Sequence, residues 1–480
     1  MATTESRIER WFQLRSRGSN YGREVRGGLV TFFAMAYIVV LNPLILGTTR
    51  DGNGQLIGGA DTEAAAIAMV AAATALVAGL MTILMGIVGR FPVAIAAGLG
   101  LNGYIAFTLA PQMSWADAMG LVVLEGVVIL LLVLTGLRAA VFHAMPTELK
   151  YAIGVGIGLF ITMIALVDAG VVRPGSPLLS YGVDGQLRGW PIFTFVFGLL
   201  LMIILMVKRV TGALLIGILA TAALGILIES VAAVGPRDEA NPTGWSLTVP
   251  SIPDQLFATP DLGLVGQFSL FGAFASIGFV AAALAVFSLV LSDFFDTMGT
   301  AFGLATEADL LDDQGDIPEF ESILVVDSVA AMVGGAASVS SNTSYIDSAA
   351  GIGEGARTGI ASVVTGALFL LAMFVSPLVT VIPQEAATPA LVIVGFLMMT
   401  QVRHIDFTDW SMGIPAFLTI ALMPFTYSIV NGIGAGIVTF VLIRLVTGRA
   451  RDVHWLMWSL ASVFVLYFAI HPLEELLGVA

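Results

Sequence analysis

Long apolar runs constrain this chain more than any other feature, because stretches of 18 or more apolar residues recur along its 480 residues. A run of that length can cross the hydrocarbon core of a bilayer as one helix. The composition agrees: 58% of the residues are hydrophobic and 11% are charged, whereas soluble proteins carry about 25% charged residues. So few charges cannot cover a soluble globule of this size. The sequence therefore predicts an all-α polytopic membrane protein.

Two apolar stretches are harder to place than the rest. Residues 263–274 are short enough for an interfacial helix, and residues 455–470 fit either a surface helix or an extra span. The remaining apolar segments are interpreted as fourteen membrane spans, near residues 24–46, 64–89, 92–110, 114–136, 149–171, 190–207, 211–234, 275–304, 322–338, 340–355, 358–380, 386–400, 411–428 and 430–447.

Basic residues indicate the orientation, since Lys and Arg concentrate in cytoplasmic loops. With the N-terminus inside, 16 of the 20 basic residues fall in inner loops or tails, the exceptions being Arg50, Arg173, Arg188 and Arg237. We therefore expect a multi-pass protein of the plasma membrane with a cytoplasmic N-terminus. There are no cysteines, and the four histidines show no metal-ligand spacing, so no metal or other cofactor is predicted.

Two of the fourteen segments are poor continuous helices. Residues 91–110 (FPVAIAAGLGLNGYIAFTLA) contain a proline, several glycines and an asparagine, and residues 338–355 (SVSSNTSYIDSAAGIGEG) are rich in Ser, Thr and Gly. Short segments interrupted by Gly or Pro at corresponding places in two halves of a chain point to a transporter binding site. These are the third and tenth segments, which occupy equivalent places in a seven-plus-seven arrangement.

A weak internal repeat supports that arrangement. The fifth segment begins HAMPTELKYAIGVGIGLF and the twelfth begins TVIPQEAATPALVIVGFL. An odd number of spans in each repeat would invert the second copy relative to the first, so the sequence predicts two inverted seven-segment repeats. The matched residues, each pair separated by 237 positions, are Pro146 and Pro383, Glu148 and Glu385, and Gly158 and Gly395.

Three aspartates, Asp293, Asp296 and Asp347, lie in or beside apolar segments. A charge at mid-bilayer costs from about 3 to more than 10 kcal/mol, so such a residue faces a protein interior or a water-filled cavity and marks a substrate or ion path. Asp293 and Asp296 are three residues apart and therefore share one helix face. The alternative is a helix end among the lipid headgroups. Glu125 also lies in an apolar run, without a clear role, and Asp168 is interpreted as an outer loop-edge residue.

Asp347 joins an expected extended stretch to an expected half-helix, where it can cap the helix, bind a substrate or do both. Broken backbone is tolerated in a membrane only where it is buried in protein or lines a cavity. Asn102 lies at the matching break of the third segment and offers a donor and acceptors to a ligand, with a helix-to-helix hydrogen bond as the alternative. Phe294 and Tyr345 are near these polar groups in the sequence and have faces suited to a flat heteroaromatic ligand.

Three motifs resemble those of the AzgA-like purine permeases, in the nucleobase–ascorbate transporter superfamily. LSDFFDTMGTAFGLA resembles their D-x-F-D-T-x-G-T element, SNTSYIDSAAGIGEGARTGI their T-x-Y-x-E-S-x-x-G…R-T-G element, and FPVAIAAGLGLNGYIAFT their G-x-G-L-N-x-Y element. The resemblance runs from about residue 22 to 450, in the family's order. One departure is Asp347, where the family usually has the longer Glu, and this bears on which purine is preferred.

The resemblance implies import of purine nucleobases (hypoxanthine, adenine and guanine) by alternating access, with a proton favoured over sodium as the coupling ion. The family's eighth-span carboxylates fall on Asp293 and Asp296, its tenth-span carboxylate on Asp347 and its third-span amide on Asn102. Members often form homodimers, and no nucleic acid is expected as a partner. The expected substrate-binding residues are Asp293, Asp296, Asp347, Asn102, Tyr345 and Phe294, and the expected proton carriers are Asp293 and Asp296.

The resemblance also implies that the two repeats build a core and a gate, with short strands and half-helices in segments 3 and 10. The expected divisions are a basic cytoplasmic tail at 1–22, core parts at 23–138 (segments 1–4) and 263–380 (segments 8–11), gate parts at 139–262 (segments 5–7) and 381–450 (segments 12–14), and an apolar C-terminal segment and tail at 451–480.

A second class of function is an anion transporter on the same fold, of the sulfate permease type, whose half-helix N-termini would bind the anion. Three acids at the site argue against it. A membrane enzyme is not supported, because the sequence has no nucleophile–base set, cofactor motif or metal cluster. A channel is not supported either, because nothing in the sequence resembles a repeated selectivity filter.

Overall fold

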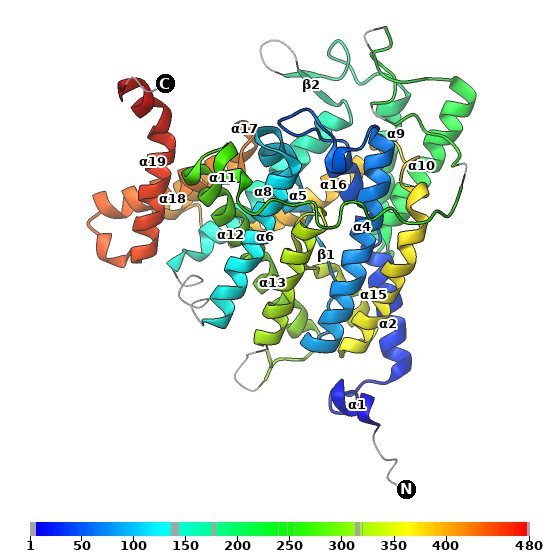
Figure 1. The fold of residues 1–480 in the computed structure, drawn as a ribbon, viewed down its shortest axis with the longest axis horizontal. Coiled ribbons are helices and arrows are strands. Elements are labelled where there is room, and N and C mark those ends of the chain that lie inside the picture. Colours follow the sequence, from blue (N-terminus) through cyan, green and yellow to red (C-terminus); the bar gives the residue numbers. More distant parts are fainter. Residues whose placement is uncertain are drawn as a thin grey trace.

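Helices dominate the computed structural model, which describes residues 6–135, 144–174, 179–238, 240–246, 248–253, 255–312, 317–318 and 320–477. Ten helices in these residues are long and apolar enough to cross a membrane. The main helices, drawn in Figure 1, are α2 (Tyr21–Met35), α3 (Ile38–Gly47), α4 (Glu63–Leu84), α6 (Trp115–Leu134), α8 (Thr147–Asp168), α9 (Trp190–Val207), α10 (Ala213–Ala232), α12 (Phe279–Glu307), α13 (Phe320–Ala336), α15 (Gly359–Ala372), α16 (Gln384–Met399), α17 (Trp410–Phe425), α18 (Ile429–Val446) and α19 (Trp455–Leu477).

The third and tenth segments are broken as predicted. Each contributes a short strand, β1 (Ile95–Ala97) and β4 (Asn342–Ser344), and the two strands pair antiparallel with Ala96 opposite Thr343. A half-helix follows each strand: α5 (Leu99–Tyr104) after β1, and α14 (Ala349–Gly353) after β4. Two distant parts of the chain therefore meet at one point inside the protein.

The strand pair satisfies backbone groups that would otherwise be left unpaired in an apolar interior, where each unpaired group costs several kcal/mol. Beyond the paired residues, the amide of Gly98 donates to the carbonyl of Ser341 at 2.9 Å, and that of Tyr345 donates to Ala94 at 3.0 Å. The hydroxyl of Thr82 on α4 accepts from the Ile95 amide and donates to the Ile95 carbonyl. Helix α4 is thereby tied to the strand pair.

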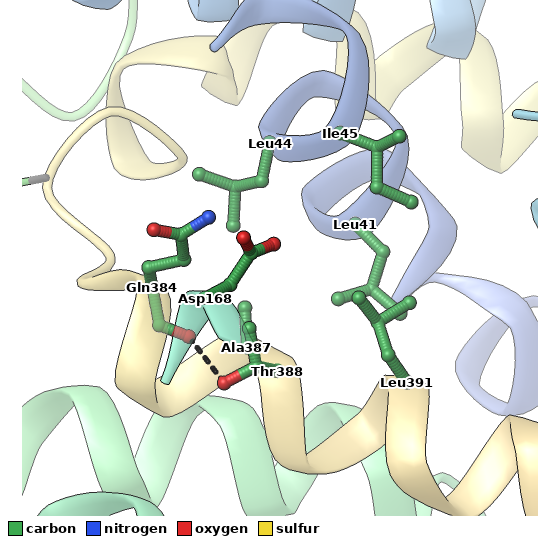
Figure 2. A pocket seen from close by; sticks show the side chains of 8 residues that line it. All are labelled: Leu41, Leu44, Ile45, Asp168, Gln384, Ala387, Thr388 and Leu391. Carbon is green, nitrogen blue, oxygen red and sulfur yellow. Dashed lines mark hydrogen bonds between the residues drawn. The ribbon is translucent and has the colours of Figure 1, made fainter. Parts of the chain in front are cut away.

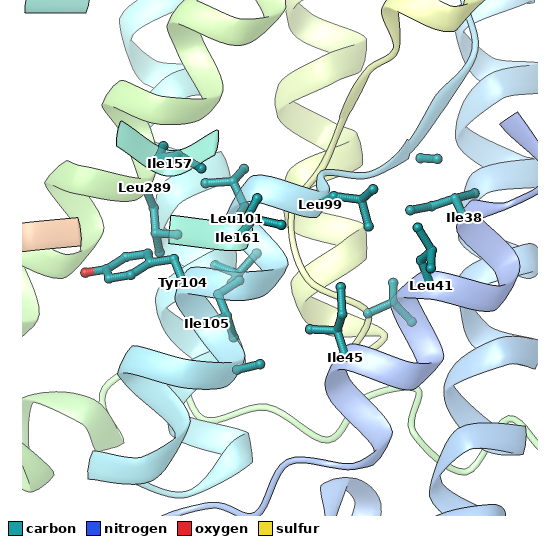
Figure 3. Close-up of a cluster of buried hydrophobic side chains, with 14 of the residues drawn as sticks. Ile38, Leu41, Ile45, Leu99, Leu101, Tyr104, Ile105, Ile157, Ile161 and Leu289 are labelled. Atoms are coloured by element: carbon teal, nitrogen blue, oxygen red, sulfur yellow. The ribbon is translucent and has the colours of Figure 1, made fainter. Parts of the chain in front are cut away.

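The half-helix α5 is held by an apolar cluster. Its side chains Leu99, Leu101 and Tyr104 are buried, and the helix continues through η3 (Ile105–Leu109). Figure 3 shows these side chains meeting others from α3, α8 and α12, among them Ile38 and Leu289. Burying each large apolar side chain contributes about 1.5–3 kcal/mol, so packing fixes a helix that is too short to be stable alone.

The helices form two groups, each packed mainly within itself. The first group contains α2, α3, α4, α6, α12, α13 and α15, and Figure 1 shows α2, α4, α13 and α15 running side by side. The second group contains α8, α9, α10, α16, α17 and α18. The packing has a repeat: α4 packs on α15 as α13 packs on α6, and α9 packs on α10 as α17 packs on α18. The helices that correspond to each other in these contacts are seven predicted segments apart, which is the pattern that an inverted repeat produces: α4 and α13, α6 and α15, α9 and α17, and α10 and α18.

A glycine pair marks the centre of the second group, where α8 packs on α16. A Cβ atom on Gly158 would lie 2.7 Å from the Gly395 carbonyl oxygen, and one on Gly395 would lie 2.5 Å from the Gly158 carbonyl oxygen. These two residues are one of the pairs matched at a spacing of 237. Equivalent residues that touch each other lie on the axis of a two-fold repeat, so this contact supports the predicted duplication.

Several segments differ from the simple prediction or refine it. The first span is two helices, α2 and α3, joined through Ala36 and Tyr37. The stretch 263–274 holds only the beginning of the short helix α11 (Gly272–Ser276). Helix α19 covers the stretch 455–470 and packs on α18 and α12. The predicted domain boundary at residue 138 lies outside the described residues.

Substituting Gly395→Ala should separate α8 from α16. The new methyl would meet the Thr162 hydroxyl and the Gly158 carbonyl, and overpacking of this kind costs about 1–3 kcal/mol. We expect a lower midpoint of thermal unfolding for the detergent-purified protein. The matched control is Gly353→Ala on α14, where a Cβ would meet nothing within 4 Å. Equal midpoints for the two variants would contradict the close approach.

Candidate functional site

The two aspartates of α12 have different surroundings. The side chain of Asp293 is fully buried, whereas that of Asp296 is exposed. Three residues advance an α-helix by about 300°, so the two carboxylates share a face but point in directions about 60° apart. A carboxylate near the middle of a membrane span does not face lipid. The exposed surface of Asp296 therefore faces water.

Asp347 lies in the short helical turn η5 (Ile346–Ser348), which precedes α14 and contacts α12. Its side chain is half-buried, and the Tyr37 hydroxyl is 3.5 Å from its Oδ2. Tyr345 lies near both Asp347 and Asp296, and its hydroxyl donates to the Ala97 carbonyl at 2.6 Å. The structure thus brings Asp296, Asp347 and Tyr345 together at the end of the β1–β4 pair.

Asn102 is fully buried rather than open to solvent. Its Nδ2 donates to Asn42 Oδ1 at 2.6 Å, while its own Oδ1 has no hydrogen-bond partner among the described residues. Asn42 in turn donates to the Thr74 hydroxyl and to the Val339 carbonyl. The helix-to-helix bond left open as the alternative for Asn102 is therefore present, and one acceptor remains free.

Phe294 is not brought to the site in this structure. It is 2% exposed and packs in an apolar cluster with Ile129, Val133, Val290 and Leu324, between α6, α12 and α13. Its ring contributes to the packing that holds α12 against these helices.

Asp327 on α13 is a polar residue of this region that was not predicted from the sequence. Its Oδ2 accepts from the Thr297 hydroxyl at 2.7 Å, and its Oδ1 accepts from both the amide and the hydroxyl of Ser344, at 3.0 and 2.9 Å. It therefore anchors β4 to α12 and α13. The signal was available, because Asp327 lies in the apolar run ILVVDSVAAM in the same way that Asp293 lies in its own run.

Asp293, Asp327 and Glu125 are buried carboxyl groups that lie near one another. Glu125, on α6, accepts from the Ser341 hydroxyl at 3.2 Å through Oε1, and its Oε2 has no partner among the described residues. Thr343 lies beside Asp293, yet neither Asp293 oxygen makes a hydrogen bond to a described residue. No ion pair joins these carboxyl groups to a basic residue in the described ranges.

The architecture and the sequence both have counterparts among known proteins. The sequence model of a permease family, that of the xanthine/uracil permeases, matches residues 22–435. The chain belongs to the xanthine/uracil permease family. It is therefore a nucleobase permease and not an enzyme.

Curated relatives match this permease over nearly its whole length. The guanine/hypoxanthine permease PbuG of Bacillus subtilis is 36% identical over 463 residues, which cover 96% of this chain and 99% of the relative. The adenine permease AdeQ of Escherichia coli is 33% identical over 462 residues, covering 96% and 95% of the two chains.

Solved structures share the fold at low sequence identity. The transmembrane domain of the cyanobacterial bicarbonate transporter BicA aligns with a TM-score of 0.56 at 15% identity, covering 87% of this chain and 98% of that one. The murine anion transporter Slc26a9 in an inward-facing state aligns with a TM-score of 0.57 at 12% identity, covering 93% and 73%. These similarities show the fold of the permease. They do not identify its substrate.

A second polar position lies between the two helix groups. Asp168, the last residue of α8, lines a narrow cavity together with apolar side chains of α3 and with Gln384 at the start of α16. Figure 2 shows its carboxylate pointing into this cavity toward Leu44. The cavity holds at most about one water molecule, so it is too small for an organic ligand in this conformation. Asp168 is thus more enclosed than a loop-edge residue.

The substitution Tyr345→Phe tests whether the Tyr345 hydroxyl stabilises the protein. It removes the hydrogen bond to Ala97 and leaves that carbonyl without this donor, at a cost of about 1 kcal/mol. We expect a lower thermal unfolding midpoint for the permease in detergent. Tyr181→Phe on the exposed strand β3 (Leu179–Tyr181) is the control. An equal fall in the unfolding midpoint of both variants would argue against a stabilising role for the Tyr345–Ala97 hydrogen bond.

Proposed function

We propose that this permease transports purine nucleobases together with protons, and that Asp296 and Asp347 hold the base. The observation that carries the proposal is the pair of solvent-accessible carboxylates, Asp296 and Asp347, near Tyr345 at the point where two broken segments meet. Relatives that this chain matches over 95% or more of their own length are named as guanine/hypoxanthine and adenine permeases. Together these observations favour a purine over other nucleobases.

The chemistry of the site suits a purine. Each purine presents ring N–H groups at its edge, and some carry exocyclic amines, and carboxylates accept such hydrogen bonds more strongly than neutral groups do. The free Oδ1 of Asn102 is a further acceptor that a conformational change can bring to the ligand. Two acids in the site also repel anions, so a sulfate-type substrate is not supported even though the fold is shared with anion transporters.

The different surroundings of Asp293 and Asp296 suggest how the acids divide the work. A fully buried carboxylate with no hydrogen-bond partner is very costly as an anion, so Asp293 is best placed to bind the coupling proton. Asp296 meets water and is best placed to meet the substrate. In this proposal a proton, rather than sodium, is the coupling ion.

The architecture suits alternating access of a core against a gate. The ten long helices, together with α13, α17 and the two broken segments, would make fourteen spans in two inverted repeats. The first helix group, with both half-helices, would be the core, and the second group would be the gate. A plasma-membrane location, a cytoplasmic N-terminus and a homodimer complete the proposal.

Uptake of radiolabelled hypoxanthine or adenine tests the function. We expect cells expressing the permease to accumulate the base, and Asp296→Ala or Asp347→Ala to reduce uptake by about tenfold or more, since a lost charge-assisted hydrogen bond costs about 1.5–3 kcal/mol. Asp184→Asn, in an exposed loop, is the control. Uptake that survives both site substitutions at the wild-type rate would refute the assignment.

A ligand screen on the purified protein tests the substrate class. Purines should raise the thermal unfolding midpoint by preferential binding to the folded state, whereas sulfate should leave it unchanged. Stabilisation by sulfate and not by hypoxanthine, adenine or guanine would favour the hypothesis of an anion transporter instead.

A further inference from the structure

Two hydroxyl groups form a short hydrogen-bonded chain beside Asp293. The Thr297 hydroxyl on α12 donates to Asp327 Oδ2 at 2.7 Å. The hydroxyls of Thr297 and Thr343 lie 2.8 Å apart, with either able to donate to the other. Thr343 belongs to β4. Asp293 lies one turn before Thr297 on α12 and shares its helix face, which places its carboxyl group near Thr343. All four side chains are buried, at 0–2% exposure.

The number of protons in this chain fixes its direction. Each threonine hydroxyl has one proton to donate. When Thr297 donates to an ionised Asp327, its proton is used, so Thr343 must donate to Thr297. Thr343 then has only lone pairs to offer to Asp293, and Asp293 can bond to it only as a protonated acid. The opposite arrangement, with every bond reversed, places the proton on Asp327 and leaves Asp293 ionised.

We propose that Asp293, Thr343, Thr297 and Asp327 form a proton relay that holds one coupling proton at either of its two ends. This inference rests on the proposed proton-coupled transport and names the groups that would carry the proton. In one step the Asp293 proton passes to Thr343, the proton of Thr343 to Thr297, and that of Thr297 to Asp327. Each hydroxyl gains one proton and loses one, so only the two carboxyl groups change charge.

The surrounding groups favour a single proton that is shared. Glu125 from α6 and Asp296 from the same helix are the other carboxyl groups that act on Asp293. The other elements packed against α12 present Tyr104 on α5 and Tyr467 on α19, which lie near each other, and Asp347 on η5, whose carboxylate is 3.5 Å from the Tyr37 hydroxyl. Two ionised carboxylates close together in a buried site repel each other, so one of them is kept protonated.

The relay is linked mechanically to the substrate site. Asp327 accepts two hydrogen bonds from Ser344, the last residue of β4. Tyr345 is the next residue along the chain, and Asp347 follows two residues after it. A neutral Asp327 accepts these bonds more weakly than an ionised one. The position of the proton thus changes how firmly β4 is held at the place where the purine would bind. Asp293 makes no hydrogen bond to any residue that the structure describes, so the relay is open at that end.

The test removes one hydroxyl at a time and keeps the side-chain shape, with Thr297→Val and Thr343→Val in proteoliposomes. Binding of radiolabelled hypoxanthine should stay within about threefold of wild type, while its accumulation under an inward proton gradient should fall by about tenfold, the equivalent of one buried hydrogen bond left unmade. Thr221→Val on α10 is the matched control, because that buried hydroxyl donates to the Gly217 carbonyl of its own helix. It should accumulate hypoxanthine as wild type does.

A second variant keeps the test decisive if the valine variants fold poorly. Asp293→Asn cannot take up or release the proton, so hypoxanthine binding should persist and lose its dependence on pH. Wild-type accumulation in both valine variants, or unchanged pH dependence in Asp293→Asn, would overturn the relay while the transport proposal stands. A wild-type protein that accumulates hypoxanthine with sodium alone would overturn the relay as well. If the wild type moves no purine under any gradient, the proposed function fails first.

Discussion

The antiparallel pair of β1 and β4 is the interaction on which the rest of this structure depends. Two segments lose their helical hydrogen bonds inside an apolar interior, where unpaired backbone groups are very costly. Each strand supplies the partners that the other lacks, and Thr82 completes the set. The pairing also joins the two halves of the chain. Because the strands are antiparallel, the half-helices α5 and α14 follow from opposite ends of the pair.

Polar groups that would be excluded from a membrane core gather around this pair and are stabilised by it. Ser344 ties Asp327 to β4, and Tyr345 ties β4 to the end of β1. Around the strands the carboxyl groups form two sets: one near water, at Asp296 and Asp347, and one fully buried, at Asp293 with Asp327 and Glu125. This separation lets one site bind an organic base and a neighbouring site bind a proton.

Local sequence patterns predicted the two interrupted segments, whereas tertiary packing determined which side chains are buried. The Gly, Pro, Ser and Thr content of residues 91–110 and 338–355 predicted interrupted helices, because those residues weaken a helix wherever they occur. The burial of Asp293 and the exposure of Asp296 depend on neighbouring helices, which one segment cannot reveal. The packing of Phe294 against Leu324 and the division of the first span beside Tyr37 have the same cause. Asp327 was missed although its apolar surroundings in the sequence resemble those of Asp293.

A structure of the purified protein determined by electron cryomicroscopy with hypoxanthine bound would test the central claim most directly. The account predicts density for a flat base between Asp296 and Asp347, at the end of the β1–β4 pair, with both carboxylates within hydrogen-bonding distance of its edge. A base bound elsewhere, for example in an enlarged cavity beside Asp168 between α3 and α16, with Asp296 and Asp347 free of contact, would contradict it.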